Sequence, residues 1–377
     1  MNKRSKNITW QQFVAILFYI LIGVVCGIIL ASLSDWVFGA ELSFWGEMIY
    51  FLGTLVIMFA AVFVQIIIHE AGHLVFGLMS GYKFSSFRIN SFMWIKENGK
   101  VKFKRLAIAG TAGQCLMAPP EPVDGKIPVV LYNLGGVLMN IITGFAFLGM
   151  CFALSSIPLL LVVMLLFALI GFVLAIMNGV PMRMGTLNND GYNTLELVRN
   201  KSALRAFWVQ LKVSEMEAEG IRLKDMPDAW FSIPSDEQMK NSMIAATGVF
   251  VCNRLMDAQR FEEADKLMNH FLEINSGIVG LHRSLMICDR MYVEIITNNC
   301  REAVDAMFSK EQKKFMKLMK DYPSVMRTEY AYALLCEKDK IKADNVKNRF
   351  EKYSKIYPYS GDMQSERELM KIAEEKV

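Results

Sequence analysis

Residues 48–73 read MIYFLGTLVIMFAAVFVQIIIHEAGH, an apolar stretch that runs directly into two histidines. Up to Ile68 the stretch contains no charge, and Gln65 is its polar interruption. A run of this length can cross the apolar core of a bilayer, which is about 30 Å thick. The stretch therefore predicts a membrane-spanning helix that ends in a cluster of ionisable residues.

Three further apolar runs have the length of a membrane span. They are residues 13–33, about 128–154 and about 159–179, and a short turn at 155–158 separates the last two. A cleaved signal peptide is the alternative for residues 1–33, but the apolar stretch exceeds the usual 7–15 residues and no clear cleavage site follows. The sequence predicts an α-helical polytopic membrane protein with four transmembrane helices.

The flanking charges predict how these helices are oriented. Residues 1–7 carry three basic residues and loop 34–47 carries only acidic ones. The segment 80–127 is basic through Lys83, Arg88, Lys96, Lys100, Lys102, Lys104, Arg105 and Lys126. Since cytoplasmic loops are enriched in Lys and Arg, we expect both termini and segment 80–127 in the cytoplasm.

The composition excludes several classes of protein. Of 377 residues, 53% are hydrophobic and 21% are charged, which is more apolar than a soluble protein. A net charge of +4 is too small to indicate nucleic-acid binding. The seven cysteines form no C-x-x-C pair, so a disulfide framework or zinc ribbon is not indicated.

The pattern changes from Thr194 onward to amphipathic helices without a spanning run. Residues 253–273 and 329–358 each resemble half of a tetratricopeptide repeat. We expect an N-terminal anchor helix and external loop over 1–47, a membrane core over 48–193, and a soluble all-α, repeat-like domain over 194–377. A protein partner is expected for the last domain.

Strand-forming sequences occur within the basic segment. Residues 84–95 and 101–105 flank Asn98-Gly99, which is a strong hairpin signal. This predicts a small cytoplasmic sheet over 82–118, in which the segment around Gly113 pairs with an extended substrate. The alternative is an amphipathic hairpin that rests on the lipid interface.

The sequence His69-Glu70-Ala71-Gly72-His73 has the H-E-x-x-H pattern. Residues four apart share one face of a helix, so both imidazoles can reach one metal ion. Zinc accepts such nitrogen ligands, and Glu70 is placed to act as a base on a bound water. The alternative is that the three polar residues simply end the helix at the membrane surface.

Asp190 is the candidate for a third ligand, because the last predicted span returns the chain to the side where the histidines lie. The alternative is that Asn188-Asn189-Asp190-Gly191 forms an ordinary turn. His270 and His282 are poorer candidates, since both lie in the polar C-terminal half.

The third apolar run begins with Asn133-Leu134-Gly135-Gly136-Val137-Leu138-Met139-Asn140. Gly135 and Gly136 are suited to close packing against the histidine helix. Asn140 is expected to donate its amide to a substrate carbonyl or oxyanion. A plain packing groove with one interhelical hydrogen bond is the alternative.

Together, the H-E-x-x-H sequence, the glycine-asparagine motif and Asn178-x-x-Pro181 leading to Asp190-Gly191 resemble the site-2 protease family of intramembrane zinc metalloproteases. The resemblance covers about residues 48–195. It implies one catalytic Zn²⁺ held by His69, His73 and Asp190, Glu70 as general base, and substrate or oxyanion contacts near Asn140. One departure is that Asp190 follows Pro181 by nine positions, with Asn189 in place of the family's leucine.

The resemblance implies an endopeptidase that cuts membrane-embedded proteins or peptides in a bilayer, such as a bacterial plasma membrane. Regulated intramembrane proteolysis, removal of signal-peptide remnants and processing of peptide precursors are all compatible with it. A membrane-anchored helical scaffold with a vestigial metal site is the alternative. A transporter is disfavoured, because the sequence shows no inverted repeat.

Overall fold

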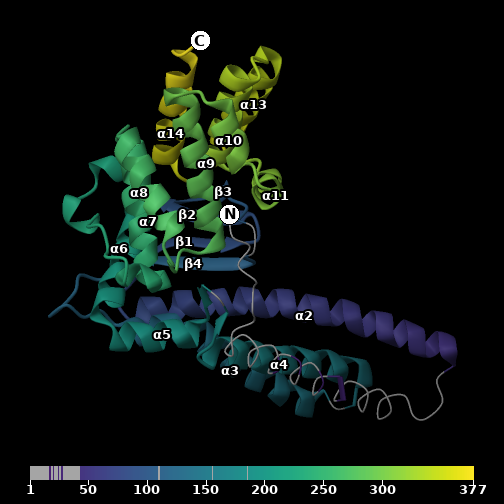
Figure 1. Ribbon diagram of the computed structural model, residues 1–377. Helices are drawn as coiled ribbons and strands as arrows, with labels where there is room; N and C mark the ends of the chain where they lie inside the picture. Colours follow the sequence, from purple (N-terminus) through teal and green to yellow (C-terminus); the bar gives the residue numbers. More distant parts are fainter. Residues whose placement is uncertain are drawn as a thin grey trace. The chain divides into compact units, whose positions relative to one another are not determined.

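The computed structural model describes residues 43–377, apart from 109, 110, 155 and 185, and five isolated positions between 17 and 28 (Figure 1). Within this part of the chain, three helices are long and apolar enough to cross a membrane. They are α2 (Phe44–Met79), α3 (Val129–Ala153) and α4 (Pro158–Gly179). The span predicted for residues 13–33 lies almost entirely outside the described residues, so a count of four stays a prediction.

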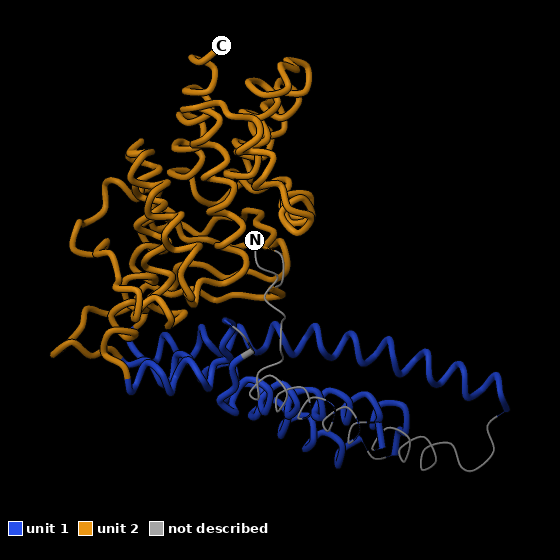
Figure 2. Tube along the Cα trace, in the orientation of Figure 1, with its two compact units in different colours: residues 1–81, 128–199 blue, residues 82–127, 200–377 orange. Residues whose placement is uncertain are grey.

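The chain divides into two compact units (Figure 2). The first comprises residues 1–81 and 128–199, and the second comprises 82–127 and 200–377. The strand segment therefore belongs to the same unit as the C-terminal helices, although the sequence order suggested an insertion in the membrane core. The boundary after α5 (Asp190–Arg199) lies a few residues beyond the expected one.

In the first unit, α3 packs against both α2 and α4. The helix α2 continues without a break through the H-E-x-x-H sequence. After α4, the strands β5 (Arg183–Met184) and β6 (Leu187–Asn188) form a minimal antiparallel pair. The chain then enters α5, which contacts α3 and α4.

The second unit begins with an antiparallel sheet of order β3-β2-β1-β4. The strands are β1 (Lys83–Ile89), β2 (Phe92–Glu97), β3 (Lys100–Arg105) and β4 (Gly113–Ala118). Asn98 and Gly99 both have positive φ, 51° and 74°, as a type I′ turn between β2 and β3 requires. The predicted hairpin is thus confirmed, but residues 84–95 form two strands instead of one, because Asn90 also turns with φ 51°.

The helices of the second unit are α6 (Lys201–Ala218), α7 (Ser242–Asp257), α8 (Phe261–Glu273), α9 (Gly280–Thr297), α10 (Arg301–Met307), α11 (Lys310–Leu318), α12 (Pro323–Ala331), α13 (Lys340–Ser354) and α14 (Ser360–Glu374). Short helical turns occur at Leu223–Asp225, Asp228–Trp230, Gln238–Lys240 and Tyr332–Cys336.

The sheet and these helices share one hydrophobic core. Met93 and Ile95 of β2 are buried in the same cluster as Met291 of α9. The backbone N–H of Arg105 donates to the carbonyl of Ile356 at 2.9 Å. These contacts join segments far apart in sequence, which explains why strands and C-terminal helices form one unit. The tetratricopeptide-like character of the helices stays a prediction.

Candidate metal centre

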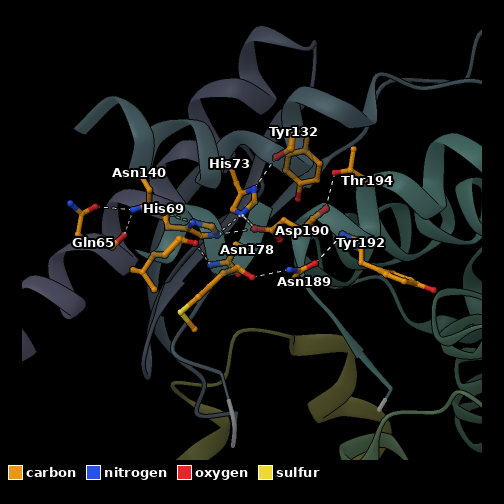
Figure 3. A network of polar contacts seen from close by, with 12 residues as sticks. Gln65, His69, His73, Tyr132, Asn140, Asn178, Asn189, Asp190, Tyr192 and Thr194 are labelled. Carbon is orange, nitrogen blue, oxygen red and sulfur yellow. Dashed lines mark hydrogen bonds and ion pairs between the residues drawn. The ribbon is translucent and has the colours of Figure 1, made fainter. Parts of the chain in front are cut away.

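Three side chains from two helices meet in the first unit (Figure 3). The Oδ2 atom of Asp190 lies 3.0 Å from Nε2 of His69 and 3.6 Å from Nε2 of His73. The two Nε2 atoms are 3.2 Å apart. Within the described residues, this is the one set of three His, Cys, Asp or Glu side chains whose ligand atoms all lie within 4.8 Å of one another.

The other ring nitrogen of each histidine has a fixed partner. Nδ1 of His73 lies 2.8 Å from the backbone carbonyl oxygen of Tyr132. A carbonyl oxygen can only accept, so this contact requires the proton on Nδ1. In a neutral imidazole the second nitrogen then carries a lone pair, and that lone pair of His73 faces Asp190.

A chain of hydrogen-bonded amide groups likewise places the proton of His69 on Nδ1. Gln65 Nε2 donates to the carbonyl of Phe167 at 2.9 Å, so its Oε1 faces Asn140. Asn140 Nδ2 donates to the Oε1 and the backbone oxygen of Gln65, at 2.8 and 3.0 Å. Its Oδ1 is left to accept from Nδ1 of His69 at 2.7 Å. Both amide hydrogens that we expected to face a substrate are therefore used by Gln65.

Two lone pairs and a carboxylate thus converge on one point, and such an arrangement requires a cation or a proton between them. In a tetrahedral zinc site the bonds are about 2.0–2.2 Å long, so ligand atoms lie about 3.3 Å apart. The observed separations of 3.0, 3.2 and 3.6 Å bracket this value. The hydrogen bonds on both Nδ1 atoms are also those that orient histidine ligands in metal sites. The residues present therefore fit a zinc ion.

Glycines allow α2 and α3 to approach closely enough to form this site. A Cβ atom at Gly135 would lie 2.6 Å from the backbone oxygen of Gly72. At Gly136, it would lie 2.5 Å from the imidazole of His69. The packing interpretation of Gly135 and Gly136 accounts for these contacts, since both residues leave space for the histidine helix.

The turn that carries Asp190 is held by Asn189. Its Oδ1 accepts from the backbone N–H of Tyr192 at 2.9 Å, as a helix N-cap does. Its Nδ2 donates to the carbonyls of Met177 and Val180, at 2.8 and 2.6 Å. Asn189 therefore ties the start of α5 to the end of α4, and the β5–β6 pair accommodates the additional residues of the atypical spacing.

The environment of Asp190 keeps it ionised. Burial alone would raise the pKa of its carboxyl. Hydrogen bonds and charge from His69 and His73 have the larger combined effect and hold the pKa well below its usual range. Glu70 follows His69 on α2 and is half-buried. Since one residue corresponds to about 100° around a helix, Glu70 lies beside the imidazoles and not in line with them.

The remaining candidates lie in the second unit. Gly113 begins β4, which is an edge strand of the sheet. His270 pairs with Asp236 at 2.7 Å, and burial lowers the pKa of His282. Neither histidine belongs to the three-residue cluster.

The sequence did not assign a role to Gln65 or Asn189. The signal for Gln65 was present, because an amide in an apolar span is costly unless it is hydrogen-bonded. It is fully buried, with an exposed fraction of 0%. The capping role of Asn189 was recognisable only in part, since Asn is a favoured N-cap but its contacts with α4 are tertiary.

A comparison with known protein families finds one match that includes these residues. Residues 47–216 match the family described as Peptidase M50B-like. No curated protein and no solved structure matches the chain in the same comparisons. The matched segment contains nearly all of α2, all of α3 and α4, and the candidate metal centre. Residues 47–216, somewhat less than half of the chain, are therefore similar to the Peptidase M50B-like family, and this match supports the resemblance to site-2 proteases.

Proposed function

We propose that the protein is an intramembrane zinc endopeptidase that hydrolyses peptide bonds of membrane-embedded proteins or peptides. The observation that carries this proposal is the convergence of both histidine Nε2 atoms on the Asp190 carboxylate, with both Nδ1 atoms occupied. A scaffold does not need histidines held in this tautomer. The membrane-anchored scaffold with a vestigial site is therefore the less favoured function.

His69, His73 and Asp190 would hold the zinc ion. When bound, zinc supplies a Lewis acid for the scissile carbonyl and lowers the pKa of a bound water from 15.7 towards about 7. Glu70 accepts a proton from the attacking water and passes it to the leaving amine. Gln65 and Asn140 keep His69 in the tautomer that directs Nε2 to the site.

The substrates that suit this site are membrane proteins in regulated proteolysis, signal-peptide remnants or membrane-bound peptide precursors. We place the enzyme in a cell membrane, such as a bacterial plasma membrane, with both termini in the cytoplasm. Gly113 and the edge strand β4 are the proposed contact for an unwound substrate backbone. The C-terminal helices are the proposed contact for a protein partner.

Replacement of the proposed base tests the function. Glu70→Gln should reduce cleavage by at least about 100-fold while zinc content, measured by elemental analysis, stays unchanged. The readout is comparative peptidomics of membranes that contain the wild type or the variant. Glu47→Gln is the matched control, because Glu47 is exposed on the same helix about 35 Å away. A Glu70→Gln variant that produces the wild-type peptide pattern would remove Glu70 from the mechanism.

Zinc content distinguishes the proposed zinc ligands from the proposed base. His69→Ala and Asp190→Asn should each lower the zinc content and abolish cleavage. If both variants retain zinc, the ion is held elsewhere and the proposed site is wrong. If the wild type binds zinc but shows no cleavage product in any membrane fraction, the scaffold function is supported instead.

A further inference from the structure

The second unit contains a partly open cavity of about 270 Å³, which is lined by its sheet and its helices. Gln114 and Leu116 of β4 form part of the wall, and α6, α7, α9, α12 and α14 form most of the remainder. The volume corresponds to about nine waters of ~30 Å³ each. It is slightly below the roughly 300–1,000 Å³ of pockets for drug-sized ligands. The cavity therefore suits a small ligand or a single side chain.

The wall of the cavity carries more negative than positive charge. Its carboxylates are Glu217, Asp257, Asp289, Asp362 and Glu366. Its permanent cations are Arg222 and Arg327. His282 also faces the cavity, and burial lowers its pKa, which favours the neutral imidazole. Buried charges are costly unless each has a partner, so the pairing of these groups decides what the cavity can bind.

The two guanidinium groups are already paired. Arg222 donates to Asp257 at 2.6 Å. Arg327 contacts Asp289 at 2.5 Å and Glu366 at 3.0 Å. Three of the five carboxylates therefore have a cationic partner within the wall.

Glu217 and Asp362 have no such partner. Asp362 accepts one hydrogen bond, from the Tyr357 hydroxyl at 3.3 Å. Among the described residues, no hydrogen bond or ion pair reaches the carboxylate of Glu217. Burial raises the pKa of Glu217 well above its ordinary value, and the charge of Asp362 adds to this shift. Glu217 is half-buried and lines the cavity, so part of its surface is accessible from the cavity.

We propose that this cavity binds an organic cation, a primary ammonium or a guanidinium group, with the carboxylates of Glu217 and Asp362 as its acceptors. The wall also presents the aromatic rings of Tyr322, Tyr357 and Tyr359, and such rings attract cations through their faces. The ligand supplies the positive charge that these two buried carboxylates lack.

A divalent metal ion fits this cavity less well. A metal site needs several oxygen ligands around one point. Within the described residues, no three acidic groups of the cavity come within 4.8 Å of one another, since the one such set is His69, His73 and Asp190. Two carboxylates without a third acidic ligand suit instead a ligand with several N–H donors, such as a lysine or arginine side chain.

This inference goes beyond the proposed protease function, because it concerns the second unit alone. Two kinds of ligand could supply this cationic group: a peptide with a basic side chain, or a free amine. We distinguish them with N-acetyl-L-arginine amide and N-acetyl-L-lysine amide for the peptide source, and spermidine for the free amine. N-acetyl-norleucine amide is the uncharged control, and CaCl₂ tests a divalent ion.

The experiment is isothermal titration calorimetry of each probe with the full chain in detergent micelles at pH 8. At least one organic cation should bind at least tenfold more tightly than the norleucine compound, and the tightest probe identifies the source. Glu217→Gln, Asp362→Asn and the double variant should weaken that binding at least tenfold. Asp265→Asn is the control, since Asp265 pairs with Arg290 and does not line the cavity.

Thermal unfolding of the same variants separates binding from folding. Removal of an unpaired buried charge should raise the melting temperature of Glu217→Gln and Asp362→Asn, while a structural role would lower it. The proposal is overturned if no organic cation binds the wild type. It is also overturned if the double variant binds the organic cation as tightly as the wild type does, or if calcium binds more tightly than every organic probe.

Discussion

Asn140 connects His69 to Gln65 through three hydrogen bonds of 2.7–3.0 Å, and its side chain is completely buried. A residue of this kind acts on a metal through its ligand, by fixing the tautomer and the direction of the imidazole. The candidate metal centre therefore includes more residues than its three proposed ligands. It extends through two amides to the Phe167 carbonyl on α4.

Asn140→Leu should weaken zinc binding about 10- to 100-fold, because His69 loses the acceptor of its Nδ1 proton. The measurement is zinc competition against a chromogenic chelator in detergent. Thr143→Val is the control: Thr143 lies one turn further along α3, and its hydroxyl donates to the Met139 carbonyl at 2.9 Å and reaches Oε1 of Gln65 only at 3.4 Å. Equal zinc affinity in Asn140→Leu and Thr143→Val would show that the amide chain does not position His69.

At this scale the sequence was most informative where residue type and spacing carry the chemistry. His69 and His73 follow from their separation on one helix face, and Asp190 follows from the direction in which the last span returns. The orientation of Asn140 was not predictable, because it depends on which neighbour its amide meets. That neighbour, Gln65, lies on a different helix.

Close helix approach is the element-scale condition for the site. The backbones of α2 and α3 meet at Gly72 and Gly135, and the ring of His69 occupies the space beside Gly136. A larger residue at any of these positions would separate the two helices or displace the ring. The same helix α3 also contains Gly149, where an added Cβ atom would meet no other part of the described structure within 4 Å.

Gly136→Ala should therefore reduce zinc affinity and cleavage at least tenfold, because its Cβ would lie 2.5 Å from the imidazole of His69. Gly149→Ala is the matched control on the same helix, and it should be neutral or stabilising by up to about 1 kcal/mol. Zinc content and thermal unfolding of both variants are the measurements. If Gly136→Ala retains the zinc affinity of Gly149→Ala, the close approach is not required.

Apolar run length predicted α2, α3 and α4 well, because a bilayer imposes the length of a span. The Asn98-Gly99 turn was equally clear, since both residues tolerate positive φ. The turn at Asn90 was missed because the residues on both sides of it have strand composition. The β5–β6 pair was missed because it depends on Asn189, whose partners lie at the end of α4.

Two units of different character make up the whole molecule. The family match covers residues 47–216 and therefore includes the sheet and most of α6. The sheet, however, completes the core of the C-terminal helices. A sequence pattern shows that a segment forms strands but does not show which distant helices cover them, so the expected grouping of the sheet with the membrane core differed from the observed units.

The charged cavity should make the stability of the second unit depend on pH. Burial raises the pKa of Asp362 and of Glu366 to about 7, although Arg327 partly offsets this for Glu366. In the unfolded chain both groups titrate near their ordinary values of 3.8 and 4.5. The folded state therefore binds more protons between these values and pH 7, and the free energy of unfolding falls as the pH rises through this range.

We expect a lower melting temperature at pH 7.5 than at pH 5.5, which corresponds to a loss on the order of a few kcal/mol. Asp362→Asn should flatten this dependence, whereas Asp265→Asn should leave it unchanged. Asp362 and Glu366 are more ionised at pH 8 than at pH 5.5, so the organic cation that binds best should raise the melting temperature more at pH 8. Parallel pH profiles for the wild type and Asp362→Asn would show that the cavity acids are not the groups that titrate.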